Sequence, residues 1–189
     1  MKKIILTVGA IFAFSLANAQ DKEDMSFGIK GGMNISAVTN ITGSSSLTGF
    51  HIGGFAEFKV SDKFTIQPEL LYSTQGDKYD GGKTNLDYIN IPVMFKYYVA
   101  DAFSLEAGPQ IGLLISGKEK LDSGTSTDVK SAYKSTDFDL DFGAGYDFTD
   151  NISAAIRYNL GLAQLQKVLP SGQSASHNSV FQVSLGYRF

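Results

Sequence analysis

The 189-residue sequence has no cysteine, no tryptophan, four prolines and two histidines. Without cysteine it has neither a disulfide framework nor a thiolate metal site. Its 16 basic residues are outnumbered by 19 acidic ones, which gives a formal net charge of −3 and no basic footprint for nucleic acid. No phosphate-binding glycine loop, zinc-ligand spacing or G-x-S-x-G motif is present. We therefore expect no nucleic-acid partner, no bound metal and no cofactor.

The one long apolar run lies at the start of the chain. A short segment with two lysines, Met1–Lys3, precedes an apolar stretch, Ile4–Leu16, and the short segment Ala17–Ala19 follows. At ~1.5 Å per residue this stretch is shorter than the ~30 Å hydrocarbon core of a bilayer. The pattern is typical of a cleaved export signal. We expect residues 1–19 to be a signal peptide and residues 20–189 to form one domain.

After residue 19, apolar and polar residues alternate with a period of two, as in Phe181–Phe189. This period is typical of β-strands with one face in an apolar medium. In each predicted strand the apolar positions carry no Asp, Glu, Lys or Arg, as expected for a face in contact with lipid. The alternation predicts eight strands, at about 26–36, 49–60, 64–75, 86–99, 103–114, 136–148, 152–162 and 179–189.

The predicted connections alternate in length. Short Asp-containing turns lie at 61–63, 100–102 and 149–151. Long polar loops are expected at about 37–48, 76–85, 115–135 and 163–178. This alternation is typical of an outer-membrane barrel with periplasmic turns and extracellular loops. The predicted fold is an all-β, eight-stranded, antiparallel, up-and-down transmembrane β-barrel with both termini on the periplasmic side.

A secreted, lipocalin-like barrel with a dry core is the alternative, because periodicity alone does not tell the inner face from the outer one. Glycine favours the membrane barrel: it recurs on the polar face, and the narrow interior of an eight-stranded barrel needs small residues. Pro68, Pro92 and Pro109 oppose a regular ladder, because proline lacks a backbone donor. We expect bulges or bends at these three positions.

Charged residues of the polar face are expected to fill the lumen. Because burying a lone charge is costly, we predict that they form an ion-pair network. A gated ion path through rearranging pairs is the alternative. The predicted members are Lys30, Glu57, Lys59, Glu69, Lys96, Glu106, Asp137, Asp139, Asp141, Asp147, Arg157 and Arg188.

Three carboxylates, Asp137, Asp139 and Asp141, share one face of a predicted strand. Carboxylates are Ca²⁺ ligands. Alternate residues of a strand lie ~6.6 Å apart, so an adjacent pair can share an ion but all three do not converge. Pairing with lysines of neighbouring strands is the preferred interpretation.

The two histidines, His51 and His177, have serines nearby in the sequence, namely Ser46 for the first and Ser174, Ser176 and Ser179 for the second. A nucleophile–base pair needs a third, orienting group within hydrogen-bond reach. In Ser-rich loops such neighbours arise from composition. We therefore expect no catalytic residues and no enzyme activity, with a lipid-modifying envelope enzyme as a remote alternative.

Several segments resemble the PorT-like outer-membrane β-barrel family of the Bacteroidota. They are Gly28–Asn34, Ile66–Ser73, Ile89–Tyr98, Gly108–Gly112 and Leu185–Phe189. The resemblance covers most of residues 20–189 and implies an outer-membrane location and a link to secretion machinery, but no catalytic motif. We expect a monomer that contacts outer-membrane lipid and acts as a structural or interaction protein through its loops. Envelope or secretion-machinery proteins are its expected partners, and a small-solute or ion channel is the alternative function.

Overall fold

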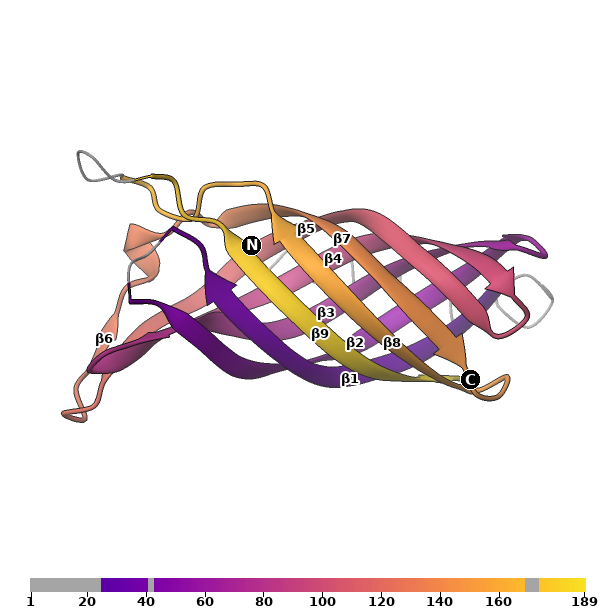
Figure 1. Ribbon diagram of the computed structural model, residues 1–189, viewed down its shortest axis with the longest axis horizontal. Coiled ribbons are helices and arrows are strands. Elements are labelled where there is room, and N and C mark those ends of the chain that lie inside the picture. The colour runs from indigo at the N-terminus through magenta and orange to yellow at the C-terminus, as the bar shows by residue number, and fades with distance from the viewer. Residues whose placement is uncertain (1–24, 41–42, 169–173) are drawn as a thin grey trace.

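The computed structural model describes residues 25–40, 43–168 and 174–189, so the predicted signal peptide lies outside the described residues. The chain forms one tilted tube of strands, with one short 3₁₀ turn, η2 (Lys130–Ala132), beyond its wall (Figure 1). No helix among the described residues is long and apolar enough to cross a bilayer. The strands are β1 (Met25–Val38), β2 (Ser45–Ser61), β3 (Phe64–Tyr79), β4 (Gly82–Ala100), β5 (Phe103–Leu121), β6 (Ser126–Asp128), β7 (Thr136–Asp147), β8 (Ile152–Gly161) and β9 (Asn178–Arg188).

Eight of these strands close into a ring. Each pairs antiparallel with the next along the chain, β5 pairs with β7, and β1 pairs with β9 to seal the wall. The three-residue β6 lies outside the ring and pairs only with the end of β5. The predicted eight-stranded up-and-down topology is confirmed.

Two ends of the barrel differ in their connections. Three tight turns join β2 to β3, β4 to β5 and β7 to β8, as predicted from their Asp residues. The start of β1 and the end of β9 lie at this same end, which we call the turn end. The opposite, loop end carries β6, η2 and, of the long connections, the described residues 39–40, 43–44, 162–168 and 174–177.

The wall is taller on one side than the sequence predicts. Strands β4 and β5 have 19 residues each, whereas β8 has only 10. The expected loop at 76–85 was wrong: β3 and β4 continue through it to a two-residue turn in which Gly81 has a φ of +91°. Residues 115–121, expected to be loop, belong to β5. At ~3.3 Å per residue, β3 to β5 therefore project well beyond β7 to β9 at the loop end.

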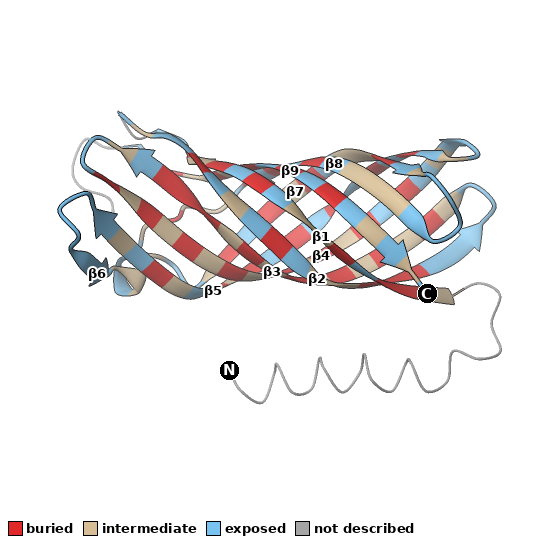
Figure 2. Ribbon diagram, turned by 90° about the horizontal axis from the view of Figure 1, so that it is seen from below, coloured by how far each residue is buried: buried red, intermediate tan, exposed pale blue. Residues whose placement is uncertain are grey.

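Residues alternate between the two faces of the wall (Figure 2). Apolar side chains point outward, for example Phe50 at 51% and Leu185 at 65% exposure. Polar and charged side chains point inward and are buried, for example Lys30, Glu69 and Arg157. The outward apolar band is the surface that lipid covers in this class of barrel.

The expected bulges at the prolines were wrong. The pairs Pro68–Val93, Pro92–Gln110 and Pro109–Leu140 all lie in a continuous register. Register shifts occur elsewhere, as between Asp87 and Tyr88 and between Tyr98 and Ala100. The ring therefore accepts a missing proline donor without changing its register.

Glycines line the inner wall where neighbouring strands come close. A Cβ atom on Gly53 would lie 2.0 Å from the carbonyl oxygen of Leu70, and one on Gly108 would lie 2.0 Å from that of Val93. Real Cβ contacts are never this short, so the narrow, strongly coiled wall requires glycine at these positions. The outward-facing Gly54 differs, because its nearest contact would be an ordinary 3.5 Å.

Candidate functional site: the polar lumen

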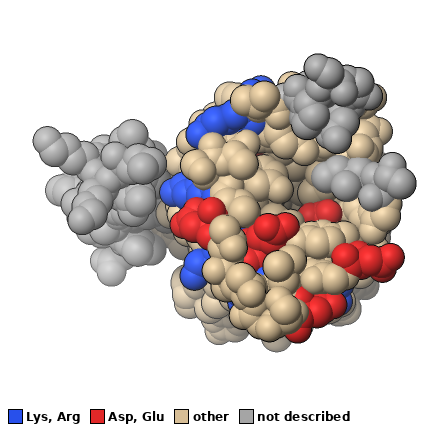
Figure 3. Space-filling model, turned by 90° about the vertical axis from the view of Figure 1, so that its left-hand side faces the viewer, with Lys and Arg blue, Asp and Glu red and all other residues tan. Residues whose placement is uncertain are grey.

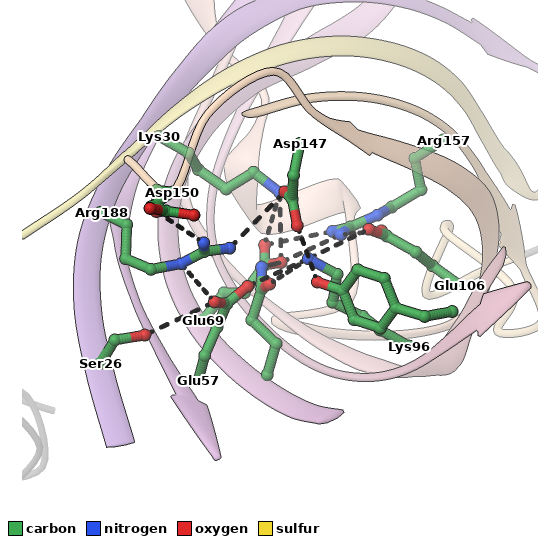
Figure 4. A network of polar contacts seen from close by, with 12 residues as sticks. Ser26, Lys30, Glu57, Glu69, Lys96, Glu106, Asp147, Asp150, Arg157 and Arg188 are labelled. Carbon is green, nitrogen blue, oxygen red and sulfur yellow. Dashed lines mark hydrogen bonds and ion pairs between the residues drawn. The ribbon is translucent and has the colours of Figure 1, made fainter. Parts of the chain in front are cut away.

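A charged layer crosses the lumen toward the turn end (Figure 4). Each of the eight ring strands contributes one charged side chain to it. Four are acidic and four are basic, so their formal charges cancel. The members of the charged layer, from β1 to β9, are Lys30, Glu57, Glu69, Lys96, Glu106, Asp147, Arg157 and Arg188.

Arg157 is at the centre of this layer. Its guanidinium donates to both carboxylate oxygens of Glu69, at 3.1 and 3.0 Å, and to Glu106 Oε2 at 2.9 Å. Lys30 Nζ donates to the other side of the Glu69 carboxylate at 3.1 Å. The two-pronged contact suits the planar guanidinium and fixes its orientation. Glu69 and Arg157 are 1% and 2% exposed, so this pair is shielded from solvent screening.

A second set of pairs faces the turn end. Lys96 Nζ lies 3.0 Å from Glu57 Oε1 and 3.7 Å from Glu106 Oε1. Arg188 contacts Glu57 at 2.6 Å and Asp147 at 3.6 Å. Glu106 therefore links the two sets, and the whole layer is one connected network.

The network neutralises charges that would otherwise be costly to bury. Moving a lone ion into a protein interior costs several kcal/mol, and a partner with good hydrogen bonds offsets that cost. Each member of the layer has at least one group of opposite charge within 4.0 Å, so none faces only like charges. The arrangement closes the lumen at this level by specific contacts between opposite walls.

The structure does not bring all the predicted members together. Lys59 lies at the turn end with its side chain 55% exposed, and it pairs at 3.7 Å with Asp62 instead. Its position on β2 is beyond the ring's rim, so its charge remains solvated. The structure places it outside the charged layer.

The expected pairing of Asp137, Asp139 and Asp141 with lysines is not found. These residues form an acidic stripe along the inner face of β7, at most 7% exposed. Among the described residues, none of the three has a basic group within ion-pair distance. Gln110 donates to Asp139 Oδ2 at 2.7 Å, and the backbone N–H of Phe138 donates to Asp137. Both carboxylate oxygens of Asp141 lack a hydrogen-bond partner.

A layer of amides and hydroxyls separates the charged layer from the loop end. His51 Nδ1 lies 2.7 Å from Asn34 Oδ1, and His51 Nε2 lies 2.8 Å from Ser184 Oγ. Asn34 and Ser184 were not predicted as partners of His51. Asn34 reaches it across the β1–β2 pairing, and Ser184, 133 residues away, reaches it through the closure of β1 against β9. His177 contacts the carbonyl oxygen of Ala163 at 3.0 Å, not a serine side chain.

The lumen opens at the turn end. A vestibule of about 710 Å³ opens there, with Glu57, Tyr98, Asp147 and Arg188 in its lining. A second cavity of about 20 Å³ reaches Ser184, and a space of that size holds about one water. The Ser184–His51 pair therefore faces no room for a substrate.

An apolar plug closes the loop end. Leu86, Tyr88 and Leu114 form a cluster inside the wall, and Tyr133 from the β5–β7 connection packs against it. Tyr133 also forms a β-bridge with Gln166, which ties two long connections together over the opening. Burial raises the pKa of the Tyr133 hydroxyl. Seen from this end, acidic and basic side chains are interspersed around the mouth (Figure 3).

A family model described as "Outer membrane protein beta-barrel domain" matches residues 18–167. The chain belongs to this family. It is therefore a small β-barrel of the outer membrane. No curated protein matches the chain.

Two solved structures share its fold. Neisserial surface protein A is 16% identical with a TM-score of 0.60, and the match covers 88% of this chain and 100% of that one. Ail, the attachment invasion locus protein of Yersinia pestis, solved with the heparin analogue sucrose octasulfate, is 16% identical with a TM-score of 0.52. That match covers 88% of this chain and 99% of that one. At this identity the likeness concerns the fold alone.

Proposed function

We propose that this protein is an interaction protein of the outer membrane that acts through its loop end and does not conduct solutes. The observation that carries the proposal is the double closure of the lumen. The charged layer blocks it toward the turns and the apolar plug blocks it toward the loops. What remains available to a partner is the outside of the barrel and its two rims.

The projecting wall of β3, β4 and β5 supports this proposal. It carries β6 at its side, and all three residues of β6 are exposed. An exposed strand edge offers backbone groups to an extended segment of a partner. The loop end is expected to face outward from the cell, as in barrels of this class.

A more specific role in protein secretion is supported by the sequence resemblance to PorT-like barrels of the Bacteroidota. The resemblance rests on segments such as Ile66–Ser73 and Ile89–Tyr98, which build the inner contacts and the lipid face. A monomer is the proposed state, with a cleaved signal peptide at residues 1–19.

We also propose that the protein is not an enzyme. Ser184, His51 and Asn34 are arranged like a nucleophile, a base and an orienting group, but each is at most 3% exposed. The cavity beside Ser184 holds about one water. A lipid or peptide substrate has no path to the hydroxyl in this arrangement.

Site-directed crosslinking in the native envelope tests the proposal, since the chain has no native cysteine. A cysteine at Ser123 in the β5–β6 connection reports on the loop end, and a cysteine at Asp101 reports on the turn end. Reproducible capture of one protein through Ser123→Cys, but not through Asp101→Cys, is the expected result. Capture of a protein through Asp101→Cys alone would indicate a periplasmic interaction and contradict the proposal. Steady single-channel conductance in planar bilayers would contradict the closed lumen.

A further inference from the structure

Lysines lie side by side across the projecting wall of β3, β4 and β5. Lys78 on β3 is directly opposite Lys83 on β4, and Lys83 is directly opposite Lys120 on β5. Lys118, two residues before Lys120 on β5, is opposite Asn85. We call these four residues the lysine row: Lys78, Lys83, Lys118 and Lys120.

The lysine row is on the outer face of the wall. Its members alternate along the strands with buried, inward-facing residues such as Thr84 and Gly117. Lys83 is half-buried, and the other three lysines are exposed. Toward the turn end, the same outward face of β4 continues with Ile89 and Ile91. The lysine side chains therefore point sideways from the barrel, above the apolar band, and not into the lumen.

The positive charge of the lysine row is not balanced by ion pairs. Among the described residues, no carboxylate lies within 4.0 Å of any of its four ammonium nitrogens. This includes Asp128 on β6, which is the register partner of Lys118, and the exposed Asp80 and Asp122 in the turns at the tip. Like charges directly opposite each other on neighbouring strands destabilise a sheet. The arrangement therefore favours an anionic partner that lies against this face.

The height of the lysine row above the bilayer selects the kind of anion. On the outward face of β4, apolar residues run from Val99 to Ile89. At ~3.3 Å per residue and a tilt of about 35–45°, they span ~25 Å, the height of the apolar band in barrels of this class. By the same arithmetic, Lys83 lies ~15 Å beyond Ile89 along the barrel axis. Phospholipid headgroups extend only ~5–8 Å beyond the hydrocarbon core, so the lysine row is at the level of a larger headgroup.

We propose that the lysine row binds phosphate groups carried on the sugar headgroup of a glycolipid in the outer leaflet. Side chains that point sideways from the wall meet the lipids beside the barrel, not a partner seated over its mouth. Lysine suits this role because its flexible stem lets the ammonium group follow a mobile phosphate as a point charge. A bound phosphate would also offset the repulsion between neighbouring lysines. The inference goes beyond the protein partner proposed above and does not depend on it.

The first test is a titration of the folded barrel, in non-ionic detergent micelles, with fluorescently labelled lipopolysaccharide whose core sugars carry phosphate. Each lysine near an anionic membrane surface strengthens binding about fivefold. The combined variant Lys78→Gln, Lys83→Gln and Lys120→Gln should therefore raise the Kd from fluorescence anisotropy at least tenfold. The matched control combines Lys59→Gln and Lys63→Gln, two exposed lysines at the turn end, and should change the Kd less than twofold.

Three results of this titration would overturn the proposal. One is an equal Kd for the unmodified protein and the combined lysine variant, or an equal Kd for dephosphorylated lipopolysaccharide. Another is phosphatidylglycerol bound as tightly through the same lysines, which would place the site at the level of phospholipid headgroups. The last is a lysine variant that keeps its affinity for lipopolysaccharide but loses the protein crosslinked through Ser123→Cys, which would assign the lysine row to a protein partner.

The second test is thermal unfolding of Lys83→Gln, which removes the lysine that has a like charge on both sides. Without lipopolysaccharide, its Tm should be about 1–2 °C above that of the unmodified protein, because repulsion within the sheet is relieved. With saturating lipopolysaccharide, its Tm should fall below that of the unmodified protein, because a ligand contact is lost. The same order of the two Tm values with and without lipopolysaccharide would contradict the assignment.

Discussion

The two halves of the lumen handle buried charge in different ways. Toward the turn end, each ring strand contributes one charge, and four acids meet four bases. Toward the loop end, β7 contributes three carboxylates. The groups that the facing strands place beside them are amides, a phenol and glycines, which carry no positive charge. The first half is complete within the chain. The second half keeps three buried carboxylates that no basic side chain of the described residues pairs with.

This contrast predicts that removing a charge lowers the free energy of unfolding in one half of the lumen and raises it in the other. Arg157→Ala should cause the largest loss, because it leaves Glu69 and Glu106 without their main partner. Breaking a buried pair from one side costs about 3–5 kcal/mol of unfolding free energy. Urea unfolding of the barrel in lipid vesicles measures it.

If Arg157→Ala does not fold, Glu106→Gln tests the same network, and we expect a smaller loss in the free energy of unfolding. Unchanged stability in the Arg157 variant would mean that the charged layer is solvated and does not close the lumen.

Gly108→Ala should have the next largest effect. Its new Cβ would collide with the Val93 carbonyl oxygen at 2.0 Å, so the β4–β5 contact must shift. A loss of about 1–3 kcal/mol is expected from overpacking. The matched control is Gly54→Ala on the lipid face, where the nearest contact is 3.5 Å and the expected change is within about 0.5 kcal/mol. Equal losses of stability in Gly108→Ala and Gly54→Ala would contradict the close contact between β4 and β5 on the inner face.

Asp139→Asn should raise the free energy of unfolding by about 1 kcal/mol, because it removes an unpaired buried charge while keeping an oxygen for Gln110. The same chemical unfolding assay measures the sign, which is the reverse of that for Arg157→Ala. A loss of stability like that of a broken ion pair would show that Asp139 has a cationic partner within the protein.

Lys59→Ala should have the smallest effect. Its pair with Asp62 is exposed at 3.7 Å, and such pairs contribute about 0–1 kcal/mol. We expect a change within about 0.5 kcal/mol in the unfolding assay. A larger loss would place Lys59 in the charged layer after all.

The sequence predicts most of the ring because lipid imposes a simple rule. Wherever the outer face meets hydrocarbon, every second residue must be apolar, and this pattern located all eight ring strands and the three turns. The rule ends at the membrane surface. Residues 76–79, 82–85 and 115–121 form strands although they are rich in Gly, Lys, Asp and other polar residues, so their composition resembles that of a loop.

The pairing inside the lumen is harder to predict for a different reason. Arg157 and Glu69 are 88 residues apart, and His51 and Ser184 are 133 apart. Their contacts depend on strand tilt and on the closure of β1 against β9, which sequence periodicity does not encode. Composition indicated a charged interior. It did not tell the members of the charged layer from the acidic stripe of β7 or from the exposed Lys59.

The direction in which the two faces point is the claim on which the rest depends. The chain has no tryptophan, so a single introduced tryptophan gives an unambiguous fluorescence signal. Phe142→Trp places it on the outer wall, where Phe142 is 46% exposed, and Tyr88→Trp places it inside, where Tyr88 is 1% exposed. In vesicles with brominated acyl chains, we expect strong quenching of the Phe142→Trp protein and none of the Tyr88→Trp protein. Quenching of the inner tryptophan, with the outer one open to aqueous iodide, would contradict the account.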